Sequence, residues 1–137
     1  MRAFRVLVLV LLGCVASKPN EPSPIMWDRD TCAGCGMVIS DHLFAAEVRA
    51  PTGTLWKFDD VGCAAKWLAK QPFANDATTM VWVTRHSDGA WLDAKAARFV
   101  AGQASPMAFN YAAGNAPEGI DFAALSRAVT APKGATR

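Results

Sequence analysis

Apolar and polar residues alternate through residues 43–50, which read LFAAEVRA. The even-numbered positions are all apolar, whereas the odd-numbered positions include Glu47 and Arg49. A period of two is typical of a β-strand with one buried face and one solvated face. A Pro-Thr-Gly turn at residues 51–53 separates this run from LWKF at residues 55–58, so the two runs predict a β-hairpin.

The hydrophobic spacing then changes from that of a strand to that of a helix. Apolar residues recur at positions i, i+3, i+4 and i+7, namely Val61, Ala64, Ala65 and Leu68. We expect Asp59 or Asp60 to cap the N-terminus of this helix, and Gln71-Pro72 to end it. The first half of the chain is therefore predicted to run strand, turn, strand, helix.

The second half of the chain mixes the same kinds of element. Residues 78–86 are rich in β-branched and aromatic side chains and predict a strand, and residues 90–93 predict a shorter one after a Ser-Asp-Gly turn. Residues 94–100 fit either a short helix or an extended segment. Residues 122–129 predict a last helix with Asp121 as its N-cap. Together the elements predict an α+β fold, a mainly antiparallel sheet with helices on one of its faces.

The first residues have the pattern of a targeting signal. Arg2 and Arg5 precede the apolar run VLVLVLLG, which is too short for a comfortable membrane span. The run ends in LLGC, which resembles the lipobox of bacterial lipoproteins and implies cleavage before Cys14 and lipid attachment to its thiol. An ordinary signal peptide or an uncleaved anchor is the alternative. We therefore expect a lipoprotein signal peptide at residues 1–13, a lipidated, proline-rich flexible tether at residues 14–30, one domain at residues 31–130 and a tail at residues 131–137.

Net charge and cysteine count narrow the possible functions. Cleavage before Cys14 would remove two arginines and lower the formal net charge from +2 to 0. A neutral protein lacks the basic face that nucleic-acid binding requires, so we expect no nucleic-acid partner. Lipidation of Cys14 would leave three cysteines, Cys32, Cys35 and Cys63. Structural disulfides use cysteines in pairs, so an odd number in an exported protein leaves at least one thiol free, reactive or bound to metal.

The sequence TCAGCGM at residues 31–37 carries the strongest chemical signal. Cys32 and Cys35 are spaced so that both thiols of one tight turn can point at one ion, and Met37 adds a thioether. Thiolate and thioether are soft ligands that select Cu(I) over Zn²⁺ or Mg²⁺. Three other interpretations stay open: a disulfide, a structural zinc site completed by other ligands, and a thioredoxin-like redox pair. For the redox pair, the following GMVIS predicts loop and strand instead of the required helix.

Further ligand candidates lie elsewhere in the chain. His42 follows the cysteine loop closely and its imidazole is a competent copper ligand, although a surface turn is the commoner place for a histidine. Met107 sits in SPM beside small residues, unlike a methionine of a helical core. Cys63 lies on the predicted helix beside its apolar stripe, so a buried, inert thiol is favoured there over a ligand. No nucleophile triad, phosphate-binding loop or HExxH motif is visible, and we expect no enzyme activity.

Several motifs occur together in a fixed order: LLGC, CAGCGM, LWKFDDVGC, VWVTRHSDGAWLDAKAARFV and SPM. In this combination the chain resembles the NosL family, the accessory lipoproteins of nitrous oxide reductase. The resemblance implies a periplasmic Cu(I) metallochaperone anchored to the outer membrane by its lipid, with ββα-type units similar in fold to the organomercurial lyase. It also implies delivery of copper to the catalytic copper centre of nitrous oxide reductase in denitrification, with that enzyme and an ABC-type maturation transporter as partners.

The expected metal is Cu(I), and its candidate ligands are Cys32, Cys35, Met37, Met107 and His42. Among these, Cys35 and Met37 match the soft-ligand region of the family most directly. The alternatives from other functional classes are a thiol–disulfide oxidoreductase that uses Cys32 and Cys35, and a structural zinc lipoprotein. Both a monomer and a dimer are compatible with the sequence.

Overall fold

The computed structural model describes residues 18–132. The expected signal peptide, the lipid site at Cys14 and most of the expected tail lie outside the described residues. The described strands are β1 (Ala46–Arg49), β2 (Leu55–Phe58), β3 (Met80–Thr84), β4 (Trp91–Asp93), β5 (Arg98–Ala101) and β6 (Tyr111–Gly114), and the helices are α1 (Val61–Leu68) and α2 (Phe122–Thr130). No helix within residues 18–132 is long and apolar enough to cross a membrane.

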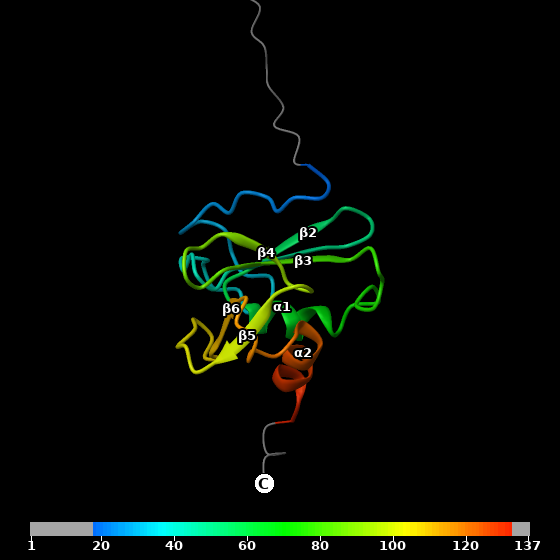
Figure 1. Cartoon of the computed structure of the whole chain (residues 1–137). Coiled ribbons are helices and arrows are strands. Elements are labelled where there is room, and N and C mark those ends of the chain that lie inside the picture. Colours follow the sequence, from blue (N-terminus) through cyan, green and yellow to red (C-terminus); the bar gives the residue numbers. More distant parts are fainter. Residues whose placement is uncertain (1–17, 133–137) are drawn as a thin grey trace, which may run out of the picture.

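Two antiparallel sheets and two helices confirm the predicted α+β class. Four strands form one sheet in the order β2-β1-β3-β4, and β5 pairs with β6 in a second, two-stranded sheet. The predicted hairpin is present, with Val48 of β1 opposite Trp56 of β2. Helix α1 lies on one side of the four-stranded sheet, and α2 packs on α1 at its side away from that sheet (Figure 1).

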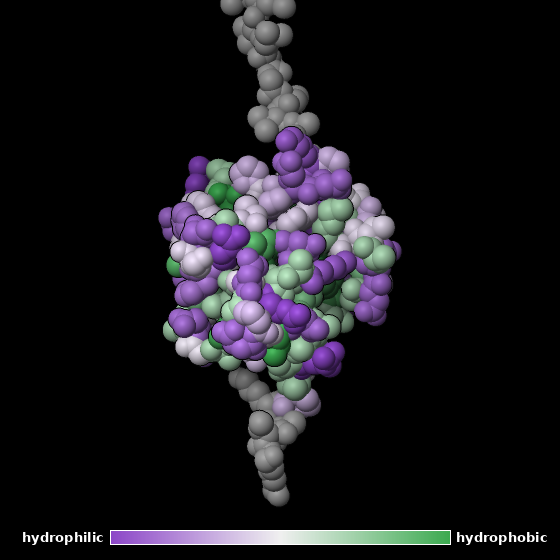
Figure 2. Space-filling model, viewed as in Figure 1, coloured by the Kyte–Doolittle hydropathy of each residue, from purple (hydrophilic) through white to green (hydrophobic). Residues whose placement is uncertain are grey.

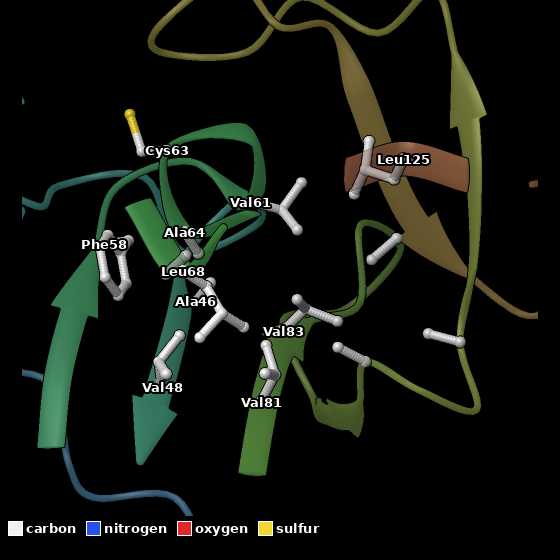
Figure 3. Close-up of a cluster of buried hydrophobic side chains, with 14 of the residues drawn as sticks. Ala46, Val48, Phe58, Val61, Cys63, Ala64, Leu68, Val81, Val83 and Leu125 are labelled. Atoms are coloured by element: carbon white, nitrogen blue, oxygen red, sulfur yellow. The ribbon is translucent and has the colours of Figure 1, made fainter. Parts of the chain in front are cut away.

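The hydrophobic core lies between the four-stranded sheet and α1. Val48 and Val83 are almost fully buried on the strands and face the apolar stripe of the helix, which ends in Leu68. Figure 3 shows these side chains together, and it shows the sulfur of Cys63 pointing away from them. Helix α1 therefore uses one face for the core and leaves its cysteine on another.

The opposite face of β1 is covered, which corrects the prediction of a solvated face. The exposed fraction is 0% for Glu47 and 7% for Arg49. Residues 18–25 cross this face, on the side of the sheet away from α1 (Figure 1). The Ser23 amide donates to Glu47 Oε2 at 2.8 Å, and the Arg49 guanidinium donates to three backbone carbonyls of residues 18–21. Ile25 belongs to the buried core, so the described part of the expected tether packs against the domain instead of standing apart from it.

The N-caps of both helices confirm the sequence prediction. Strand β5 is left open by the sequence, and strand β6 is not predicted by it. Asp60 caps α1 by accepting from the Gly62 amide, and Asp121 caps α2. Residues 98–101 are extended, which settles the choice that the sequence left open, and the partner strand β6 was not predicted. On the face seen in Figure 2, hydrophilic and hydrophobic residues are interspersed.

Candidate metal site

The cysteine pair sits on a tight loop between residues 31 and 38. The Gly36 amide donates to the Cys32 carbonyl at 2.8 Å, and the Cys32 amide donates to the Met37 carbonyl at 2.7 Å. Gly36 adopts a φ of +77°, a left-handed conformation that glycine accommodates without a Cβ penalty. The Ala33 amide donates to the carbonyl of Lys57 on β2, which ties the loop to the sheet.

The loop packs against the start of α1, which brings two further candidate ligands, Asp59 and Cys63, close to its cysteines. Asp59 directly follows β2 and is 2% exposed, and Cys63 lies in the first turn of α1. A Cβ added to Gly34 would lie 3.2 Å from the Cys63 Cβ, so the glycine lets the loop approach the helix closely. The two consecutive aspartates point apart: Asp60 caps the helix, while Asp59 turns to the cysteines.

Three thiols and one carboxylate converge at this point. The Sγ atoms of Cys32, Cys35 and Cys63 and a carboxylate oxygen of Asp59 all lie within 4.8 Å of one another. We call these four residues the cysteine cluster. The three cysteines are free thiols, and Cys35 Sγ donates to the two Asp59 oxygens at 3.4 and 3.5 Å.

Hydrogen bonding within the cluster separates the acidities of its thiols. The Cys63 thiol and the Asp59 backbone amide donate to the Cys32 sulfur, which lowers the pKa of Cys32 to about 6 against the effect of burial. Burial raises the pKa of Cys35 to about 11. The pKa of Cys63 rises because its S–H group donates a hydrogen bond to the Cys32 sulfur and because its surroundings are desolvated. Within the metal-free cluster, Cys32 is therefore the cysteine that ionises most readily, and Cys35 and Cys63 ionise less readily.

A groove of about 520 Å³ opens beside the cluster. Its lining residues come from the cysteine loop, α1 and the loop after β5: Gly34, Cys35, Cys63, Lys66, Trp67, Lys70, Met107, Ala108 and Phe109. A cavity of about 560 Å³ also lies between α1 and α2, but none of its lining residues is a cysteine, methionine or histidine. The groove beside the cluster is therefore distinguished by the sulfur-containing side chains that line it and not by its volume.

The loop of residues 105–110 forms one wall of the groove because Asp60 holds it. Asp60 Oδ2 accepts from Ser105 Oγ at 2.6 Å and from the Met107 amide at 3.1 Å. Phe109 packs directly on Gly62, where an added Cβ would lie 2.1 Å from the Phe109 Cγ. The residue that caps α1 thus also sets the position of Met107 beside the cluster.

The structure brings together only some of the sequence-predicted ligands. Cys32 and Cys35 are in the cluster, and Met107 lines the groove next to it. Met37 is 57% exposed and is not a lining residue of the groove. His42 is exposed and stacks on Trp27, with ring centroids 3.8 Å apart, and it is not a member of the cluster.

Two members of the cluster, Asp59 and Cys63, are not among the sequence-predicted ligands. The sequence predicts Asp59 as a candidate helix cap and favours a buried, inert thiol for Cys63. The signal in the sequence that points to Cys63 is the odd number of cysteines, which requires a role for a third thiol.

Comparison with known protein families gives one match to a family model. The family model NosL matches residues 24–118. This span contains the cysteine loop, Asp59, Cys63 and Met107. A search of the curated proteins found no match to the chain.

Proposed function

Because the chain belongs to the NosL family of copper-linked accessory proteins, we propose that it is a Cu(I) metallochaperone whose cargo binds at the cysteine cluster. We further propose that Cys14 anchors it by lipid to the periplasmic side of the outer membrane. Its recipient is nitrous oxide reductase, whose catalytic copper centre it supplies with the help of an ABC-type maturation transporter.

The observation that carries this proposal is the convergence of three sulfur atoms within 4.8 Å. Thiolates are soft ligands that favour Cu(I) over harder ions. Two of the thiols, Cys32 and Cys63, are 3% and 6% exposed, so they hold an ion away from solvent. Cys35 is only half-buried and is the ligand from which an ion can be passed on.

Binding of the cargo is coupled to proton release. The pKa of Cys32 is lowered to about 6, whereas the raised pKa values of Cys35 and Cys63 favour their protonated forms. An arriving Cu(I) takes the place of the S–H protons, which pass to solvent as the thiolates form. Before the metal arrives, Asp59 accepts a hydrogen bond from the Cys35 thiol and so keeps that sulfur turned toward the cluster.

Thiol–disulfide exchange is the less suitable function for this arrangement. Such exchange needs a thiolate that a partner disulfide can reach. The thiol with the lowered pKa, Cys32, is 3% exposed, whereas the more accessible Cys35 has a raised pKa. The thiol that ionises most readily, Cys32, is thus buried, and the thiol near the surface, Cys35, ionises poorly.

The test compares metals and then follows transfer. Purified metal-free protein is titrated anaerobically with Cu(I) and, separately, with Zn²⁺, because three cysteines and a carboxylate are also an acceptable zinc set. We expect tight binding of one Cu(I) that displaces zinc, and loss of this binding in Cys35→Ser. Preferential retention of Zn²⁺, or insulin reduction without metal, would support the alternative functions instead.

The recipient is tested with the copper-loaded protein. It is incubated with metal-free nitrous oxide reductase and membranes that contain the transporter, and copper in the re-isolated reductase is measured. We expect copper in the reductase with the loaded protein and none with Cys35→Ser. Equal loading by free Cu(I) at the same total concentration would contradict a carrier role.

A further inference from the structure

The groove beside the cysteine cluster has the composition of a docking surface. Trp67, Met107 and Phe109 give it an apolar wall, and Lys66 and Lys70 give it a basic wall. No residue among those that line it is acidic. The groove therefore favours an occupant that combines apolar side chains with negative charge.

The two lysines are available to such an occupant. Lys66 and Lys70 are exposed and four residues apart, so both stand on the same side of α1 and the turn that follows it. Within residues 18–132, neither lysine forms an ion pair or a side-chain hydrogen bond. No residue of that range therefore compensates their charges by direct contact.

The same groove is the route to the metal ligands. Cys35 and Cys63 line it, whereas Cys32 and Asp59 do not. Met107 also lines the groove, is 36% exposed and offers a thioether beside the route. A partner ligand that enters the groove thus meets Cys35 and Met107 next to the cluster. Polarizable sulfur also packs well against aromatic rings such as those of Trp67 and Phe109.

We propose that this groove docks an acidic segment of the copper acceptor that carries a methionine, and that the methionine sulfur receives Cu(I) from Cys35. The proposal rests on the Cu(I) carrier function proposed above. The ion remains Cu(I) throughout, because one ligand replaces another without electron transfer. A Cu–S bond to the incoming thioether forms as the Cu–S bond to Cys35 breaks, and the released Cys35 thiolate takes a proton from a buffer acid.

Docking is tested with two fluorescently labelled synthetic peptides. Each contains the same two methionines, flanked by glutamates in one peptide and by lysines in the other. Fluorescence anisotropy with the metal-free protein reports docking alone, and stopped-flow measurements with the Cu(I)-loaded protein report transfer. The variants are Lys66→Glu/Lys70→Glu and, as a control with the same change of charge, Arg98→Glu/Arg127→Glu, whose residues are exposed and do not line the groove.

We expect the protein to bind the acidic peptide at least about tenfold more tightly than the basic one, with an affinity that falls as salt is added. The groove variant should lose this preference and transfer copper at least about tenfold more slowly, with unchanged Cu(I) affinity, while the control variant behaves as the parent. Equal binding of the two peptides, or equal effects of the two variants, would overturn the docking proposal. A protein that binds the acidic peptide but no Cu(I) would overturn the proposed function and leave the docking result standing.

Discussion

Replacement of Glu47 by glutamine is expected to remove a large pH dependence from the stability of this protein. Glu47 lies on β1 between Lys57 of β2 and Trp82 of β3, and residues 18–25 cover it completely. Its Oε2 accepts from the Ser23 amide, but its Oε1 is buried and has no hydrogen-bond partner. The Lys57 ammonium is hydrogen-bonded elsewhere, at 2.7 Å from Asp30 Oδ2, so it does not neutralise Glu47 by direct contact.

Burial raises the pKa of Glu47 from its ordinary value of 4.5 to about 7, although the Ser23 amide and the charges of Lys57 and Arg49 oppose the rise. Between these two pH values the folded protein holds a proton that the unfolded chain has lost. Stability is therefore greatest below pH 4.5 with respect to this group, and it falls as the pH rises toward about 7. At about 1.4 kcal/mol per pH unit, the loss is about 3 kcal/mol of unfolding free energy.

The assay is urea unfolding followed by tryptophan fluorescence at pH 5 and at pH 8, with metal-free, reduced protein. Glu47→Gln keeps an acceptor for Ser23 and cannot ionise, so the variant should gain about 2 to 3 kcal/mol relative to the parent between the two pH values. Glu118→Gln, at an exposed position, is the control and should show no such change. If the free energies of unfolding of the parent and of Glu47→Gln differ by the same amount at both pH values, Glu47 ionises equally in the folded and unfolded states, and its raised pKa is refuted.

Other predictions concern the loop over the groove and the uptake of copper. Gly62→Ala should lower the free energy of unfolding, measured by urea unfolding, by at least about 2 kcal/mol, because the added methyl group displaces Phe109. Gly114→Ala is the control and should be well tolerated, because nothing lies within 4 Å of its added Cβ. Asp60→Ala should lower the free energy of unfolding by about 2 kcal/mol or more, since it removes a helix cap and two partly buried hydrogen bonds to the 105–110 loop. A loss within the range of a simple cap would show that the loop does not depend on Asp60. Cu(I) affinity should rise by about 100-fold per pH unit near pH 7.5, because two thiols with raised pKa values must release their protons. Competition titrations at two pH values test this, and a Cu(I) affinity that does not change with pH would contradict it.

The sequence correctly predicts those strands and helices that depend on residues close together in the chain. The hairpin of β1 and β2 follows from alternation and a turn, and both helix N-termini follow from an aspartate before an apolar stripe. Strand β6, by contrast, reads YAAG, and its small residues carry no alternating signal. It is a strand because β5 pairs with it, a contact that no short window of sequence contains.

The site was only partly predictable for the same reason. The spacing of Cys32 and Cys35 identified one half of the cluster, because both lie on one loop. The other half depends on where that loop packs, which is set by a hydrogen bond from Ala33 to Lys57 and by the close approach of Gly34 to Cys63. The position of Cys63 beside the apolar stripe indicated burial correctly, but it could not indicate that two other thiols are buried at the same place.

The role of Cys63 as the third thiol of a Cu(I) site is tested by an anaerobic competition titration. Cu(I) is titrated against a chromophoric chelator with the parent, with Cys63→Ser and with Ala64→Ser, a control that adds a buried hydroxyl to the next position of α1 without removing a sulfur. If Cys63 is a ligand, Cys63→Ser weakens Cu(I) binding at least about tenfold, while Ala64→Ser leaves it nearly unchanged. Parent-like affinity in Cys63→Ser would show that Cys63 is not a ligand and would restrict the site to the cysteine loop.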